Sequence, residues 1–469
     1  MKKERRTENL IFLFIILLQS LFFLSLKITP LYALLIFLWG IYFLYLNLNP
    51  LKFKEALSQL FLLNLGFAVS FLIINFVLPK FSLFYSSVPI MSFGMLSYLL
   101  FGNYEVAIFI NLLLSMFVGL LVNSLNQVLI LFIPSLLCLI LLYKQKKRPQ
   151  IIKAALVAGV LQILLNSSLN SLDVRNLEIL KKCVISDLGN SIFSFIFVLG
   201  VLPLLENFFG VVTNIRLLEL SDTNHPLLKK LNLEAPGTYL HSLIVANLAE
   251  SAAESIGANS LLARVGAYFH DIGKISKAEY FVENQLYRKD RHKALTPTMS
   301  KLVIINHVKE GVELAKKYRL PQPVIDFISQ HHGTSLISYF YHQATKDLTE
   351  KEKEKMKDEF RYPGPKPQTK ETAIVLLADS IEAASRVLEE PTPSRIRELV
   401  KEIIRVKLED GQLDESGLSL KELEKIEEVF IRLLTALFHA RIEYPKTQDV
   451  PDKSFQQSKK DTSTHQKNN

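Results

Sequence analysis

Cysteine and histidine are the residues whose scarcity says most about this 469-residue chain. The 2 cysteines, Cys138 and Cys183, have no CxxC spacing, which excludes a disulfide framework and a zinc ribbon. All 10 histidines lie at or beyond His225, so the first 224 residues have none. A glycine-rich phosphate loop, a nucleophile elbow and an internal repeat are also lacking, so the enzyme classes marked by those motifs find no support.

Long apolar runs fill the chain up to about residue 205, and a membrane-crossing helix needs roughly 20 such residues. We predict eight spans, at 9–26, 29–49, 56–78, 83–101, 104–122, 125–143, 151–171 and 185–205. The first would also fit a cleaved signal peptide, but no small-x-small cleavage site follows it, which favours an uncleaved anchor. The fourth and fifth are separated only by Gly102 and Asn103 and would also fit a re-entrant pair.

Basic clusters predict the orientation of these spans. They lie at 2–6, 52–54 and 144–148, and an even number of spans puts all three on one side, which the positive-inside rule identifies as cytoplasm. Both termini and the C-terminal half are then cytoplasmic, and the chain is a multi-pass protein of the cell membrane. Because these clusters contribute to the net charge of +9, we do not interpret that charge as a nucleic-acid footprint, and we expect no nucleic-acid polymer as partner.

Three acidic residues lie in the apolar half: Glu105, Asp173 and Asp187. Intramembrane carboxylates can mark ion paths, but these three fall at predicted span ends or in connecting loops, where water reaches them. Matching pairs of Gly/Pro-broken spans, which point to a transporter's binding site, are also lacking. We therefore interpret the membrane half as an anchor or receptor.

The second half predicts an all-α domain at 236–445, joined to the membrane domain at 1–205 by a linker at 206–235 and followed by a disordered polar tail at 446–469. The linker contains a helix-like run at 214–220. A helix at 261–273 brings His270 and Asp271 into its last turn and stops at Gly273. Amphipathic helices at 393–409 and 419–440 either close the domain or form a subunit contact. A homodimer is therefore one of the possibilities that the sequence allows.

Seven residues of this domain have the types and the order needed to hold two metal ions: His241, His270, Asp271, His307, His331, His332 and Asp379. Consecutive helix residues point about 100° apart, so the His270-Asp271 pair is suited to two ions, with the two oxygens of Asp271 as a bridge. We assign the first ion to His241, His270, Asp271 and Asp379, and the second to Asp271, His307, His331 and His332. So many imidazoles favour first-row transition metals over magnesium.

The same residues, with Gly273-Lys274 after the His-Asp pair, resemble the HD superfamily of metal-dependent phosphohydrolases. Four further stretches resemble its membrane-bound phosphodiesterases of the PgpH type, at 235–239, 330–334, 360–367 and 378–383. That resemblance implies seven membrane helices before a cytoplasmic HD domain, iron or manganese as the metal, and hydrolysis of cyclic di-AMP to 5′-pApA. Two such ions can turn a shared water into hydroxide and stabilise both the attacking and leaving oxygens at phosphorus.

Other features refine this resemblance or depart from it. The first two predicted spans are separated only by 27–29, whereas typical members carry a large extracellular domain there, so the input signal is open. Gly333-Thr334-Ser335 follows the paired histidines, not the Gly-Tyr-Pro motif of guanine-specific relatives, which favours cyclic di-AMP over cyclic di-GMP. The loop at 363–366 either flanks the pocket or is a solvated excursion.

Lys274 has two interpretations. As a catalytic and substrate-binding residue beside Asp271, it would neutralise a phosphate oxygen; alternatively, it caps the carbonyls of the preceding helix. Two other functions remain for the chain: an HD hydrolase of another nucleotide, such as cyclic di-GMP, a guanosine polyphosphate or a dNTP, and a membrane receptor that binds nucleotide without catalysis.

Overall fold

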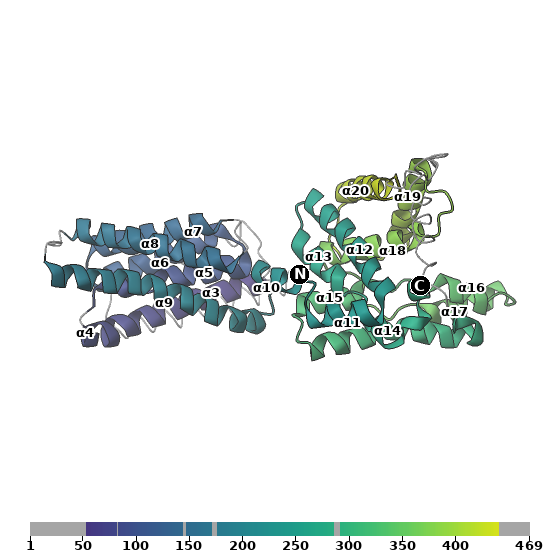
Figure 1. Ribbon diagram of the computed structural model, residues 1–469, viewed down its shortest axis with the longest axis horizontal. Coiled ribbons are helices and arrows are strands. Elements are labelled where there is room, and N and C mark those ends of the chain that lie inside the picture. The colour runs from purple at the N-terminus through teal and green to yellow at the C-terminus, as the bar shows by residue number, and fades with distance from the viewer. Residues whose placement is uncertain (1–52, 82, 144–146, 171–175, 286–290, 440–469) are drawn as a thin grey trace, which may run out of the picture.

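The computed structural model describes residues 53–81, 83–143, 147–170, 176–285 and 291–439. Within these ranges the chain forms two helical bodies that follow one another along the long axis, an apolar bundle and a second domain (Figure 1). The same ranges contain no strand, only an isolated bridge between Leu336 and Arg361. The predicted all-α fold class is confirmed.

The first body is a bundle of long apolar helices. Five helices in the described ranges are long and apolar enough to cross a membrane, and Tyr85–Phe101 is a shorter apolar one. The elements are α3 (Phe53–Leu72), continued by the π-helical η1 (Ile73–Val77) and α4 (Leu78–Phe81), then the 3-10 turn η2 (Tyr85–Ser87), α5 (Ile90–Phe101), α6 (Tyr104–Leu121), α7 (Leu125–Leu142), α8 (Arg148–Leu169) and α9 (Leu177–Phe209). They lie where the third to eighth spans are predicted; the first two predicted spans fall outside the described residues, and eight stays a prediction.

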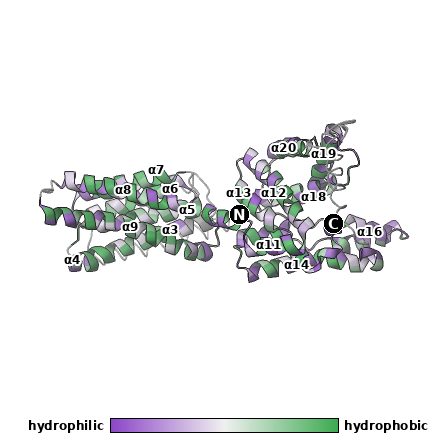
Figure 2. Ribbon diagram, viewed as in Figure 1, coloured by the Kyte–Doolittle hydropathy of each residue, from purple (hydrophilic) through white to green (hydrophobic). Residues whose placement is uncertain are grey.

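Apolar residues predominate along the helices of this bundle (Figure 2), and many large apolar side chains on its outside are exposed. Phe76, Leu125 and Phe208 are 67%, 75% and 71% exposed. In water, side chains of this size cost roughly 1.5–3 kcal/mol each relative to burial. Their arrangement over a whole helical bundle is therefore that of a surface facing lipid.

Helix α5 is too short to span a bilayer core by itself. Its 12 residues give a length of about 18 Å against a hydrocarbon thickness of about 30 Å. The preceding turn η2 provides further depth, because its Ser86 is buried between other helices. Irregular backbone at that depth is tolerated only where its polar groups are satisfied by the protein, and Gln162 and Asn190 donate to the Ser86 carbonyl at 2.6 and 3.0 Å.

The same polar cluster corrects the prediction for Asp187. This residue does not lie in a wet loop: it is part of α9, has no exposed surface, and accepts hydrogen bonds from Asn166 at 2.9 and 3.2 Å. Cys183 contributes a further contact at 3.2 Å, and Asn166 also donates to the Ser86 hydroxyl. Of the other two acidic residues, Glu105 is exposed in the first turn of α6, as predicted, and Asp173 lies outside the described residues.

The second body contains a central group of helices that carries the predicted ligands. Its elements are α11 (Pro226–Glu234), α12 (Pro236–Ser255), α13 (Ser260–Phe269), the 3-10 segments η3 (Ile272–Tyr280), η4 (Val282–Asn284) and η5 (Arg291–Ala294), α14 (Pro297–Lys317), α15 (Gln322–Gln330), α16 (Ser338–Ala344), α17 (Glu350–Lys357), η6 (Asp358–Phe360), α18 (Lys370–Ser385), α19 (Pro393–Glu409) and α20 (Leu420–His439). Helix α12 packs against α13, α18 and α20. Residues such as Val400 and Phe430 place α19 and α20 in the same apolar core, so these amphipathic helices close the domain.

Helices α9 and α10 (Asn214–Leu220) connect the two bodies, and α10 has the bounds that the sequence predicts. At the junction, Glu206 of α9 accepts hydrogen bonds from the backbone N–H and hydroxyl of Thr213, at 3.1 and 2.5 Å. Ile215 packs with the membrane helices, whereas Leu217 packs with the core of the second domain. The change from one core to the other thus occurs within α10.

Candidate metal centre

The predicted ligands come from five helices that converge at their ends or at one face. His241 lies on α12, His270 and Asp271 follow α13, His307 lies on α14, His331 and His332 follow α15, and Asp379 lies on α18. The predicted helix at 261–273 ends earlier, at Phe269. Its continuation is the 3-10 segment η3, so His270 and Asp271 occupy the corner between two helical axes.

Gly273 does not end a helix, as the sequence suggested, but lets α14 approach. A Cβ atom at this position would lie 1.8 Å from the backbone oxygen of His307 and 2.6 Å from the backbone nitrogen of Gly311. Only glycine fits such a contact, which brings the His307 side chain to the His-Asp corner. Gly333 has the left-handed φ of +54° and turns the chain directly after His332.

The two oxygens of Asp271 face two different groups of ligands. Oδ1 lies 3.3 Å from Nε2 of His307 and 3.5 Å from Nε2 of His331. Oδ2 lies 3.3 Å from Nε2 of His270 and 3.6 Å from Nε2 of His241. This buried carboxylate is thus placed as a bridge between two sites.

The two groups have the membership predicted from sequence. One contains His241, His270, Asp271 and Asp379, the other Asp271, His307, His331 and His332, and within each the ligand atoms lie within 4.8 Å of one another. Asp379 links the groups a second time, since its Oδ1 is 3.0 Å from Nε2 of His241 and its Oδ2 is 3.6 Å from Nδ1 of His332. The structure brings all seven residues together.

Hydrogen bonds fix four of the rings in the orientation that a ligand needs. The Nδ1 atoms of His270, His307 and His331 lie 2.7, 2.5 and 3.0 Å from the backbone carbonyls of Ala267, Ile304 and Ile328. Each Nδ1 therefore carries a proton, and Nε2 points at the cluster. A carbonyl or carboxylate behind the ring is the usual partner of a metal-binding histidine.

Glu382 does the same for His241 and is a functional residue that we did not predict. Its Oε2 lies 2.6 Å from Nδ1 of His241, its side chain is 2% exposed, and Arg386 donates to its other oxygen at 2.6 Å. Asp379 and Glu382 are three residues apart on α18, so both face α12. The i,i+3 spacing is the only local signal, and it indicates a shared helix face, not a partner.

The charge states of the cluster suit metal binding. Burial alone would raise the pKa of Asp271 and Asp379, but their cationic and hydrogen-bonding neighbours outweigh it and hold both pKa values well below the usual range. Burial lowers the pKa of His331, and burial together with the neighbouring His331 lowers that of His332 well below its usual range. The carboxylates are therefore ionised and these two imidazoles neutral, with free lone pairs.

Lys274 lies inside the site and does not cap the preceding helix. Its Nζ is 2.6 Å from Oδ2 of Asp271 and 3.0 Å from Oε1 of Glu283. Burial alone would lower the pKa of Lys274, but these two carboxylates raise it, and Lys274 in turn lowers the pKa of Glu283. Thr238 donates a 3.0 Å hydrogen bond to the same oxygen of Glu283, which holds the carboxylate in place.

The loop at 363–366 packs beside the residues that follow the paired histidines, and that it flanks a substrate pocket stays a prediction. A Cβ at Gly364 would lie 3.1 Å from the side chain of Thr334, and Pro367 approaches Gly333. The preceding Tyr362 stacks on the His332 ring with 4.2 Å between centroids and an interplanar angle of 23°.

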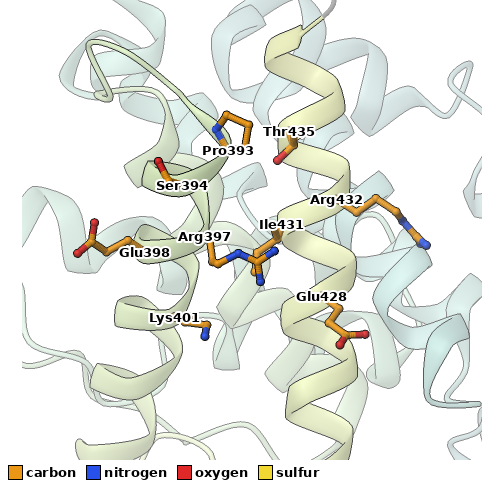
Figure 3. Close-up of a pocket in the computed structure, with 9 residues that line it drawn as sticks. All are labelled: Pro393, Ser394, Arg397, Glu398, Lys401, Glu428, Ile431, Arg432 and Thr435. Carbon is orange, nitrogen blue, oxygen red and sulfur yellow. The ribbon is translucent and has the colours of Figure 1, made fainter.

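A groove of about 950 Å³ runs elsewhere, between α19 and α20, and its lining includes Arg397, Lys401 and Ile431 (Figure 3). None of the seven predicted ligands lines it. The metal-ligating cluster and this groove are therefore separate features of the domain.

Unpaired buried atoms show that the cluster fits metal ions. In the described part of the chain, Nε2 of His270 and Oδ1 of Asp271 are buried without a hydrogen-bond partner, whereas Oδ2 of Asp271 has the Lys274 ammonium beside it. Leaving such groups unsatisfied costs about 1–3 kcal/mol each, and a divalent cation would satisfy both of the unpaired atoms. Imidazole and carboxylate donors together suit such an ion.

Comparisons with known proteins agree with this geometry. Residues 25–213 match the family model described as 7TM receptor with intracellular HD hydrolase, and residues 238–384 match the HD domain. Cyclic-di-AMP phosphodiesterase PgpH of Bacillus subtilis (strain 168) is 46% identical over 289 residues, which are 61% of this chain and 39% of that protein. The protein of the same name from Listeria monocytogenes serotype 1/2a (strain 10403S) is 46% identical over 290 residues, 62% of this chain and 39% of that protein.

Among solved structures, the crystal structure of the L. monocytogenes phosphodiesterase PgpH HD domain in complex with cyclic-di-AMP is 47% identical, with a TM-score of 0.44. The alignment covers 46% of this chain and all of that one. The present chain spans 39% of the length of the two curated relatives. The resemblance stated from sequence is confirmed, and an HD domain with these clusters implies a divalent metal.

Proposed function

We propose that this chain, in which a 7TM-receptor membrane region precedes an HD domain, hydrolyses cyclic di-AMP to 5′-pApA at the inner face of the cell membrane. The two relatives named as cyclic-di-AMP phosphodiesterases support the substrate, since they are 46% identical over a region that includes the HD domain. The basic clusters at the ends of predicted spans support a cytoplasmic HD domain and cytoplasmic termini.

The single observation that carries the proposal is the position of Asp271. Its two oxygens face two separate groups of nitrogen and oxygen donors, and Oδ1 is buried without a hydrogen-bond partner. A two-ion site with a shared carboxylate accounts for both facts. We propose iron or manganese, because five of the seven donors are imidazoles, which magnesium accepts poorly.

When bound, two such ions would polarise the scissile phosphodiester and activate a water for in-line attack. The chain's own residues would hold the ions and neutralise the charge of the substrate. Asp271 and Asp379 keep their negative charge at neutral pH because the surrounding cations depress their pKa values. Lys274 contributes a fixed positive charge beside Asp271, where it can pair with a phosphate oxygen of the substrate.

The surrounding contacts keep this charge in position. Asp271 and Glu283 hold Lys274, and Thr238 in turn holds Glu283. The ammonium is therefore ordered before substrate arrives, which reduces the side-chain entropy lost on binding. Such preorganisation is the usual source of electrostatic stabilisation in an active site.

The test is anaerobic reconstitution of the full chain with iron or manganese, followed by chromatography of the products from cyclic di-AMP. We expect pApA from the unsubstituted chain and none from Asp271→Ala or His332→Ala. His342→Ala is the matched control, because that histidine is exposed on α16 and belongs to neither group. We expect this control to retain activity.

Substrate competition separates the alternatives. If cyclic di-GMP, a guanosine polyphosphate or a dNTP were the preferred substrate, the proposed metal centre would stand but the proposed substrate would be wrong. Tight binding of cyclic di-AMP without any turnover by the metal-loaded chain would instead favour a non-catalytic receptor.

A further inference from the structure

A cyclic dinucleotide brings two negative phosphodiester groups, and the metal cluster with Lys274 accounts for only one of them. The other must lose water as the ligand enters a concave site. An anionic group that is desolvated without a partner costs far more than one that is paired. The site of the proposed reaction therefore needs a second cation, close to the metal cluster but separate from its ligands.

Lys407, near the C-terminal end of α19, meets these conditions. Its Nζ donates a 2.8 Å hydrogen bond to the hydroxyl of Ser335, three residues after the second-group ligand His332. The Ser335 carbonyl accepts a 3.1 Å hydrogen bond from the backbone of Tyr362, whose ring stacks on His332. The ammonium is thus connected through Ser335 to the stacked pair Tyr362 and His332, beside the second metal group.

Lys407 also lacks the counter-ion that its neighbours have. Arg361 makes two hydrogen bonds to the Asp410 carboxylate, at 2.7 and 3.0 Å, and Gln412 donates a third at 2.9 Å. Lys274 is paired with Asp271 and Glu283. Lys407, by contrast, takes part in no ion pair with any residue of the described ranges; its partner is the neutral Ser335 hydroxyl.

The side chain of Lys407 is only partly exposed to solvent. Burial lowers the pKa of Lys407, the negative charges of Asp379 and Asp410 act against that effect, and the positive charge of Arg361 adds to it. Asp379, a member of the first metal group, is thus close enough to influence the lysine without an ion-pair contact. A partly buried ammonium near a metal cluster, without a carboxylate of its own, is suited to an incoming anion.

We propose that Lys407 binds the phosphate of the cyclic dinucleotide that is not cleaved, while the metal centre and Lys274 hold the phosphate that is. This assignment rests on the proposed function. It makes α19, which lies beyond the residues matched by the HD-domain model, part of the substrate site. It also predicts that Lys407 acts on binding and not on the chemical step.

The experiment uses the metal-loaded full chain in four versions: unsubstituted, Lys407→Gln, Lys407→Arg and Lys401→Gln. Lys401 is the matched control because it lies on the same helix, is 58% exposed, and faces the separate α19–α20 groove (Figure 3). Each is assayed with cyclic di-AMP, which has two phosphodiesters, and with bis(p-nitrophenyl) phosphate, which has one. The Kd for cyclic di-AMP is measured in parallel.

Loss of a charge-assisted hydrogen bond to phosphate predicts a rise of about 10- to 100-fold in KM and Kd for cyclic di-AMP in Lys407→Gln. We expect kcat to be retained, bis(p-nitrophenyl) phosphate turnover to be unchanged, and Lys407→Arg to recover most of the affinity. Lys401→Gln should match the unsubstituted chain throughout.

Unchanged KM and Kd in Lys407→Gln would overturn the assignment, as would an equal loss on both substrates, which marks a structural role through Ser335. If the unsubstituted chain binds cyclic di-AMP without hydrolysing it, the proposed function fails while Kd still tests Lys407. If it neither binds nor hydrolyses it, both fail.

Discussion

Glu382 offers a test of how the protein orients a metal ligand, because its removal leaves all seven predicted ligands in place. Its Oε2 lies 2.6 Å from Nδ1 of the buried His241, so the carboxylate holds the ring with Nε2 toward Asp379 and Asp271. A carboxylate behind a ligating imidazole also makes that imidazole a stronger donor. The effect of Glu382 should therefore be on metal affinity.

Substituting such a partner costs typically about 10- to 100-fold in metal affinity, or roughly 1.4–2.8 kcal/mol. We expect Glu382→Ala to lie in this range. Glu382→Gln should lie between Ala and the unsubstituted chain, because the amide oxygen still accepts from Nδ1 but carries no charge. Arg386, the other partner of Glu382, is 36% exposed, so water can take over its hydrogen bond and limit any loss of stability.

The assay is metal titration of the chelator-stripped full chain, with thermal unfolding as a check on the fold. Glu398→Gln is the control, since this exposed glutamate of α19 lines the separate groove. A folded Glu382→Ala chain that binds both ions as tightly as the unsubstituted one would refute the reasoning.

Three further predictions concern the packing at Gly273, the protonation of His270 and the ring of Tyr362. Gly273→Ala places a Cβ 1.8 Å from the His307 backbone oxygen and should cost stability at the upper end of about 1–3 kcal/mol, seen as a lower Tm and weaker metal loading; an unchanged Tm would contradict the close contact. Burial alone lowers the pKa of His270, but Asp271 and Asp379 raise it to about 10, so the metal-free chain keeps the stabilisation by that proton below about pH 6.5 and loses it toward pH 10. Because the proton competes with the ion, apparent metal affinity should rise across the same window, and pH-independent titrations would count against this competition. Tyr362→Ala should lower kcat/KM by about 2- to 10-fold by removing the ring stacked on His332, while Tyr362→Phe stays near the unsubstituted value.

The sequence was sufficient for the all-α fold and for the grouping of the ligands, because histidines and aspartates in this order carry a specific chemical pattern. The sequence failed where a residue is explained by a contact with a segment that is distant in the sequence. Gly273 looked like a helix terminator, but it is the neighbouring helix α14 that requires glycine there. Asp187 was predicted to be accessible to water because it lies near a predicted span end, but α8 and the η2 turn bury it.

Lys407 and Glu382 were missed for the same physical reason. Lys407 contacts Ser335 across 72 residues of sequence, and Glu382 contacts His241 across 141. A surface lysine and a buried one at the same helical position look alike in a single sequence, since periodicity gives a face but not what packs against it. Such partners are visible only after the chain has folded.

The central claim is that Asp271 is shared between two metal ions, and elemental analysis tests it most directly. The active, anaerobically reconstituted chain should contain two transition-metal ions, with EPR spectra of the manganese form showing magnetic coupling between them. Asp271→Ala should lose that coupling and most of the bound metal, because each ion loses a ligand. An active chain with one ion, or an Asp271→Ala chain that keeps two coupled ions, would contradict the account.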